Sequence, residues 1–238
     1  VHEEPEKFVE RLKKWRDDPS SDQELEKWYN NVYKSPHERP YDFVGGIKRP
    51  AKIREYAEGY KIVAPADLDN SKQLLSPADV NKIFKRIPKA LRQLVSEIQL
   101  LDYRNPADSY WEQVYNIPGF MSFATGGQGQ IHFYENGYMS KQAILVRLFR
   151  TLAHEAGHNL DQVLGRTIPE SHRRFSISSD WIEAIVKDGG GMVSQYAQKA
   201  NSPVEDFADS VAFFVKDKRE FAKLFPSRAK ILKAVLRR

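Results

Sequence analysis

The chain of 238 residues is long enough for one large domain or two small ones, and its 41% hydrophobic and 29% charged residues are typical of a globular protein. It holds no cysteine, which excludes disulfides, thiolate catalysis and cysteine-type zinc sites, and it has no apolar run long enough to span a membrane. Its net charge of +5 comes mostly from Lys216–Arg238, where we expect solvated helix faces rather than a nucleic-acid surface, because no basic motif interleaved with aromatic residues accompanies it.

The first part of the chain, residues 1–60, is strongly charged and mostly helical in pattern. Two amphipathic stretches separated by a turn at Asp18–Ser20 predict a helical N-terminal extension, and a loop is expected from Arg39 to Gly46. The sequence begins at Val1 without an initiator methionine or a signal-like apolar stretch, so we expect a processed or truncated form. We predict a second domain over residues 61–238, with a sheet-containing part over 61–165 and a helical part over 166–238.

The segment from residue 60 to residue 134 alternates strand and helix signals. Ser76 followed by Pro77 predicts a helix with serine as its cap. Strands are expected at Tyr60–Pro65 and Ile98–Leu101, and two further extended runs, Met121–Ala124 and Gln130–Tyr134, are joined by glycines. These two runs predict a hairpin or a sheet edge directly before the next helix.

A long helix follows, from a Ser140 cap to Gly165, with apolar residues recurring every three or four positions. It carries His154, Glu155 and His158. Residues four apart lie on one side of a helix, so both imidazoles can bind one metal ion, and Glu155 can take a proton from a bound water. This is the H-E-x-x-H arrangement of zinc peptidases, although two satisfied core histidines beside a chance glutamate would give the same letters.

A catalytic zinc site needs a third protein ligand. Asp161 and Leu164 stand where the metzincin pattern requires glycine and histidine, so the ligand must come from further along. Glu205 and Asp209 lie four apart on a helix that starts at Ser202, so Glu205 can bind the metal while Asp209 accepts the outer N–H of a ligand histidine. The alternative is that Glu205 merely completes a capping box with Ser202. His132 lies ahead of the helix and is better explained as a strand histidine.

Three short stretches together resemble the gluzincin metallopeptidases, and most of all the anthrax-lethal-factor-like group that includes the bacterial Pro-Pro endopeptidases. They are His154-Glu-Ala-Gly-His158, Ser194-x-Tyr196-Ala and Glu205-Asp-Phe-Ala-Asp209, and the resemblance extends from about Met121 onward. It implies one Zn²⁺ held by His154, His158 and Glu205, with Glu155 as general base and Tyr196 as oxyanion donor. It also makes Asp209 and Asp161 acids that support the ligands.

The resemblance implies an α+β fold of the zincin type, with a small mixed sheet packed on the H-E-x-x-H helix and a helical C-terminal part. It further implies a secreted bacterial zinc metalloendopeptidase. An extended polypeptide substrate can add to the open edge of the strand before the helix, near Gln130–Tyr134, although a purely structural hairpin explains the same residues equally well. Tyr134 and Tyr138 are alternative oxyanion donors. The competing hypothesis is a catalytically inactive, zinc-stabilised binding module or effector, which would not need Glu155, and hydrolysis of a non-peptide amide is a further possibility.

Overall fold

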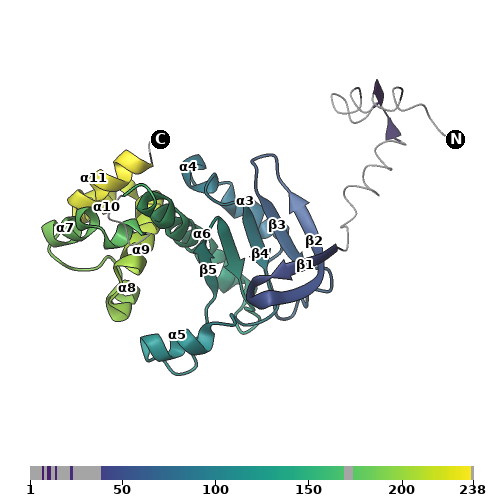
Figure 1. Ribbon diagram of the computed structural model, residues 1–238, viewed down its shortest axis with the longest axis horizontal. Helices are drawn as coiled ribbons and strands as arrows, with labels where there is room; N and C mark the ends of the chain where they lie inside the picture. The colour runs from purple at the N-terminus through teal and green to yellow at the C-terminus, as the bar shows by residue number, and fades with distance from the viewer. Residues whose placement is uncertain are drawn as a thin grey trace.

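The computed structural model describes residues 39–168 and 174–236, together with Lys7, Glu10, Arg11, Lys14, Asp22 and Gln23. This part of the protein is α+β, as the sequence predicted. A six-stranded mixed sheet packs on the long helix α6 (Lys141–Gly165), and a helical C-terminal part follows on the other side of that helix (Figure 1). Among the residues described, none of the helices combines the length and apolarity that crossing a membrane requires.

The sheet has the strand order β1-β2-β3-β4-β6-β5. The first three strands pair antiparallel, β3 pairs parallel with β4 and β4 with β6, and β5 closes the sheet antiparallel to β6. The parallel centre is buried on both faces: Ile62–Pro65 of β3 and all four residues of β4 are buried, including the polar Glu97 and Gln99 of β4. The bounds are β1 (Arg39–Phe43), β2 (Ile47–Glu55), β3 (Lys61–Pro65), β4 (Glu97–Leu100), β5 (Ala124–Gly127) and β6 (Gln130–Phe133), with the 3-10 turn η2 (Val44–Gly46) between the first two.

The predicted hairpin before the long helix is present as β5 and β6, although its first strand is Ala124–Gly127 rather than the expected Met121–Ala124. Its two-residue turn, Gln128 and Gly129, has positive φ at both positions, which suits the right-handed twist of the two strands. However, the expected edge strand at Gln130–Tyr134 is wrong. These residues form the interior strand β6, and the outermost strand is β5, because β6 also pairs with β4.

Within residues 39–140, three helices precede α6. In α3 the Ser76 side chain accepts from the Asp79 N–H, and the Asp79 carboxylate accepts from the Ser76 N–H, so the predicted serine cap is a complete capping box. Ser140 likewise caps α6, as its hydroxyl accepts from the Ala143 N–H at 3.2 Å. The helices before α6 are α3 (Pro77–Phe84), α4 (Lys89–Arg92) and α5 (Asp108–Tyr115).

The C-terminal part is built from short helices around α9 (Pro203–Lys216), which lies against α6. Ser194 caps α8 and Ser202 caps α9 through side-chain bonds to Ala197 N–H and Glu205 N–H. The remaining elements are η3 (Phe175–Ile177), α7 (Ser179–Lys187), α8 (Gln195–Ala200), α10 (Lys218–Leu224) and α11 (Pro226–Val235). Figure 1 shows this group of helices and the sheet on opposite sides of α6.

The main hydrophobic core lies between the sheet and the helices and includes Phe84, Leu148, Trp181 and Phe207. A smaller cluster around Phe43, Val63 and Tyr134 covers the other face of the sheet. α6 is therefore covered by the sheet on one side and by α9 on the other, and a rigid helix of this kind is well suited to hold a site in fixed geometry.

The predicted helical extension is wrong over residues 39–55, which form the strands β1 and β2, including the stretch expected as a loop. These strands extend the same sheet as β3, so the sheet-containing part begins before residue 61. In β2 exposed positions alternate with less exposed ones from Ile47 to Arg54, and four of its five charged residues are exposed, which gave the stretch a helix-like charged pattern. Of the rest of the predicted extension, the structure describes residues 56–60 and the six single residues named above, whereas His2, His37 and His172 lie outside the described residues.

Candidate metal centre

The close approach of α6 and α9 builds the centre. At Gly157, inside the H-E-x-x-H motif, an added Cβ would lie 3.0 Å from the Ala208 Cα and 3.2 Å from the Ala208 carbonyl oxygen. Both are backbone atoms that cannot move independently of α9. The glycine therefore lets α9 lie directly on α6, which brings the first turn of α9 over the two histidines.

His154, His158 and Glu205 meet at this contact, and their ligand atoms all lie within 4.8 Å of one another. The His154 Nε2 is 3.1 Å from the His158 Nε2 and 3.2 Å from the Glu205 Oε2, and the last pair, His158 Nε2 and Glu205 Oε2, is 3.6 Å apart. Ligands held about 2.0–2.1 Å from a tetrahedral zinc ion lie about 3.3 Å from one another. The three edges therefore match the ligand spacing of such an ion, and the sequence-predicted triad is assembled.

The sequence allows two roles for Glu205, metal binding or capping of α9, and the position of its side chain distinguishes between them. The Ser202 hydroxyl accepts from the Glu205 N–H, so half of a capping box is present. The Glu205 carboxylate, however, turns toward the two histidines, and its Oε2 is buried without a hydrogen-bond donor among the described residues. A buried carboxylate oxygen without a donor is costly unless a cation sits beside it, so the residues present fit a metal ion.

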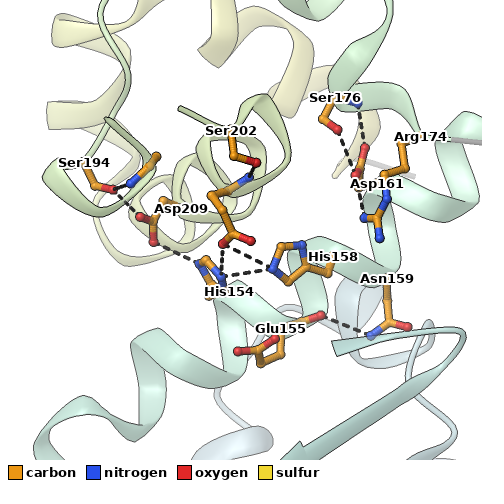
Figure 2. A network of polar contacts seen from close by, with 12 residues as sticks. His154, Glu155, His158, Asn159, Asp161, Arg174, Ser176, Ser194, Ser202 and Asp209 are labelled. Atoms are coloured by element: carbon orange, nitrogen blue, oxygen red, sulfur yellow. Dashed lines mark hydrogen bonds and ion pairs between the residues drawn. The ribbon is translucent and has the colours of Figure 1, made fainter. Parts of the chain in front are cut away.

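Asp209, one turn after Glu205, orients the first histidine. Its Oδ1 lies 2.9 Å from the His154 Nδ1, and because a carboxylate only accepts, this nitrogen carries a proton, which leaves Nε2, the nitrogen that faces the triad, as the one that can ligate a metal. The same carboxylate accepts from the Arg150 Nη2 at 3.0 Å and from the Ser194 hydroxyl. Figure 2 shows His154 between Asp209 and His158, with Ser194 behind the carboxylate.

The electrostatics of the centre favour positive charge. Burial is the largest influence on His154 and favours the neutral ring, but Asp209 and Glu205 together outweigh it and raise the pKa of His154 to about 10. Burial likewise acts to raise the pKa of Glu205, and the two histidines outweigh it and hold that pKa well below its usual range. Burial also acts against Asp209, whose pKa is nevertheless lowered to about 2 by His154.

Glu155 lies beside the triad under the edge strand. It is 5% exposed, and burial, the largest cause, raises its pKa despite the two neighbouring histidines. An added Cβ on Gly126 of β5 would lie 2.4 Å from the Glu155 carbonyl oxygen, so only glycine allows the strand to run this close to the helix. Asn159, which the sequence analysis did not single out, ties the two elements together: its Nδ2 donates to the Gln130 carbonyl and its Oδ1 accepts from the Gly129 N–H.

The centre opens into a cleft of about 570 Å³. The triad and Glu155 lie on its floor together with Thr151 and two arginines of α6. One wall is apolar and comes from α5 and the chain that leads into β5, and the opposite wall comes from α8 and α9. The wall residues are Trp111, Phe120, Met121, Phe123, Tyr196 and Val204. The centre is thus accessible to a large molecule.

Tyr196 stands at the edge of this cleft on α8. Its ring centroid is 6.4 Å from that of His154, and it is 41% exposed. The alternative donors do not line the cleft: Tyr134 is buried and its hydroxyl lies 2.9 Å from the Thr125 hydroxyl, and Tyr138 is exposed elsewhere. His132 contacts Thr125 and Gln130 instead of the triad.

Asp161 is fully buried but bonds away from the ligands. It accepts from the Ser176 N–H at 2.6 Å, from the Ser176 hydroxyl at 2.9 Å and from the Arg174 Nη1 at 3.2 Å. Figure 2 shows this group on the far side of His158 from Asp209. Among the predicted supporting acids, Asp209 therefore contacts a triad histidine, whereas the bonds of Asp161 fasten η3 to α6. The predicted role of Asp161 as an acid that supports the metal ligands stays a prediction.

No protein-family model matches the chain, and no curated protein matches it. The chain has a mixed sheet beside a long helix whose His154 and His158 pack with Glu205 in a possible metal site. That arrangement is consistent with a site of the H-E-x-x-H type.

Proposed function

We propose that this protein is a zinc-dependent metalloendopeptidase of the gluzincin type. One observation carries the proposal: His154, His158 and Glu205 form a triangle of ligand atoms with zinc-like spacing on the floor of an open cleft that Glu155 shares. A site that only stabilises the fold tends to close its fourth position with a further ligand. This one faces a cleft of about 570 Å³, which supports a catalytic rather than a structural metal.

The donor set, two imidazoles and one carboxylate, is that of peptidase zinc centres, which is why we propose zinc rather than a harder cation. When bound, the ion supplies Lewis-acid chemistry: it lowers the pKa of a coordinated water to about 7 and polarises the scissile carbonyl. Asp209 fixes His154 in the tautomer whose Nε2 can ligate.

The chain's own groups carry the proton transfers and charge stabilisation. We assign Glu155 as the general base that accepts a proton from the attacking water and returns it to the leaving amine, because it follows a ligand directly and lines the cleft. Tyr196 is positioned at the rim on the α9 side of the triad and would donate to the oxyanion that develops on the carbonyl.

The substrate would be a polypeptide in extended conformation. β5 is the edge strand beside α6 and passes directly over Glu155, so a peptide added to β5 would lie along the cleft with a peptide bond near the triad. This replaces the expected position along Gln130–Tyr134. A secreted bacterial enzyme, as the resemblance implies, remains part of the proposal.

The test compares the wild type with Glu155→Gln on a diverse peptide library, with zinc content measured in parallel. The variant is isosteric and leaves the three proposed ligands intact, so we expect one zinc per chain in both proteins and a fall in cleavage rate of about 10²- to 10⁴-fold. Glu183→Gln, an exposed change on α7, is the matched control and should cut at the wild-type rate. Full activity in Glu155→Gln would contradict the assignment, and zinc without any cleavage would favour the inactive binding module.

A further inference from the structure

The charged residues around the cleft are unevenly distributed. Its floor is one face of α6, where Arg147 and Arg150 precede the triad by two turns and one turn. Arg174 lines the cleft beyond His158, beside Asp161. Three arginines therefore flank the metal centre along the length of the cleft.

The acids of the cleft lie at the centre and are already engaged. Glu205 is a proposed ligand, Asp209 holds His154, and Glu155 lies beneath β5. These are the acidic residues among those that line the cleft in the described part of the chain. Away from the centre, the charged groups that a bound peptide would meet are therefore cationic.

Each guanidinium keeps donors for a ligand. Arg150 uses its Nη2 on Asp209 and is 61% exposed, and Arg174 uses its Nη1 on Asp161. Arg147 pairs with no carboxylate among the residues that the structure describes: its guanidinium lies 5.9 Å from the centroid of the Phe123 ring, and its Nη1 lies 3.5 Å from the Met139 sulfur. A guanidinium has five N–H groups, so each arginine can still bind a carboxylate.

The spacing along α6 gives the position of such a carboxylate. At about 1.5 Å per helical residue, Arg147 lies about 10 Å along the axis from His154, and an extended peptide covers that distance in about three residues. β5 runs in the same direction as α6, since Phe123 lies by Arg147, Gly126 by Glu155 and Gly127 by Gln162. A peptide antiparallel to β5 would therefore place its C-terminal side at Arg150 and Arg147.

We propose that the cleft selects polypeptides with a carboxylate two to three residues C-terminal to the cleaved bond, recognised by Arg147 and Arg150. This inference rests on the proposed peptidase function. The carboxylate could belong to an Asp or Glu side chain or to the C-terminus of the substrate, and the two sources share the same chemistry at the arginines.

The test uses one peptide that the zinc-loaded wild type cuts, made with Glu, Gln or Lys at each position within four residues of the cut. Each version is made with a free and with an amidated C-terminus. We expect Glu to be cut about three- to tenfold faster than Gln, and Lys more slowly, at the second or third position C-terminal to the cut. Arg147→Glu should reverse the order of Glu and Lys.

Arg86→Glu is the matched control, because Arg86 is also exposed and also stacks on a phenylalanine, Phe149 at 5.2 Å, yet does not line the cleft. Binding of the same labelled peptides to zinc-loaded Glu155→Gln, measured by fluorescence anisotropy, gives a readout independent of turnover and should show the same preference. A preference only for free over amidated C-termini, lost in Arg147→Glu, would assign the carboxylate to the chain end.

Equal cleavage of the Glu, Gln and Lys peptides in the wild type, with no change in Arg147→Glu, would overturn this inference while leaving the peptidase function intact. A charge preference confined to the N-terminal side of the cut would overturn the assignment to Arg147 and Arg150. If no peptide of the library were cut by the wild type, the proposed function itself would fail, and the two failures are thus distinguishable.

Discussion

Glu205 and Asp206 are neighbours in α9 but belong to two different buried clusters of charged residues, one open on the cleft and one closed. Asp206 belongs to a closed cluster with Arg228 of α11 and Asp188 at the end of α7, whose side chains are fully buried. Glu205 belongs to the triad with His154 and His158, which opens on the cleft. The first cluster has its own cation in Arg228, whereas the second opens on the cleft.

The closed cluster satisfies its charges internally. Arg228 donates through Nε to Asp188 at 3.1 Å, through Nη1 to Asp206 at 3.0 Å and through Nη2 to the Gly191 carbonyl at 3.1 Å. Its guanidinium also lies 4.3 Å from the centroid of the Phe225 ring. Among the described residues, the open cluster keeps a buried Glu205 oxygen without a hydrogen-bond donor. Buried charges are paired or coordinate metals, so the closed cluster is structural and the open one is a possible metal site.

The largest effect should come from breaking the closed cluster. Arg228→Ala leaves two buried carboxylates without their cation, and we expect the free energy of unfolding to fall by about 3–5 kcal/mol in urea titrations. Lys187→Ala, which removes an exposed ion pair with Glu183 on α7, is the control and should cost less than about 1 kcal/mol. A loss of similar size in both variants would mean that the buried cluster contributes no more than a surface pair.

Removing the metal should lower the stability that the open cluster contributes and leave the contribution of the closed cluster unchanged. A ligand present at 100 times its Kd stabilises the native state by about 2.7 kcal/mol, so chelation should lower the free energy of unfolding by about that amount. The cost of Arg228→Ala should be the same with and without chelator. Identical unfolding curves for treated and untreated wild type would show that the triad binds no stabilising ion.

The smallest effect should come from Gly157→Ala, which alters the helix contact that supports the triad. The new Cβ would press on the Ala208 backbone, and we expect a loss of about 1 kcal/mol together with weaker zinc binding, because Glu205 lies one turn before Ala208. Gly191→Ala, where an added Cβ meets no atom within 4 Å, is the control. Unchanged zinc affinity, measured by competition with a chelating dye, would argue against this role of the glycine.

The sequence predicted the triad because its signals are local. The four-residue spacing of His154 and His158 and the spacing of Glu205 and Asp209 each depend only on helix periodicity, and the serine caps mark where the helices begin. The edge strand was misplaced because β6 becomes interior through parallel pairing with β4, a contact between segments about thirty residues apart.

The burial of a charged residue also cannot be predicted from a local sequence pattern. The basic C-terminal segment indicates solvated helix faces, yet Arg228 within it is fully buried, because its carboxylate partners come from α7 and α9. Asn159 and Ser194 could not be assigned from spacing, since their partners on the hairpin turn and on Asp209 are brought to them only by the fold.

The most direct test of the central claim is anomalous diffraction at the zinc absorption edge from crystals of the purified protein. We predict one strong peak per chain, within about 2.0–2.2 Å of His154 Nε2, His158 Nε2 and a Glu205 carboxylate oxygen. The absence of a peak at the triad in zinc-soaked crystals, or a peak held by other residues, would contradict the account.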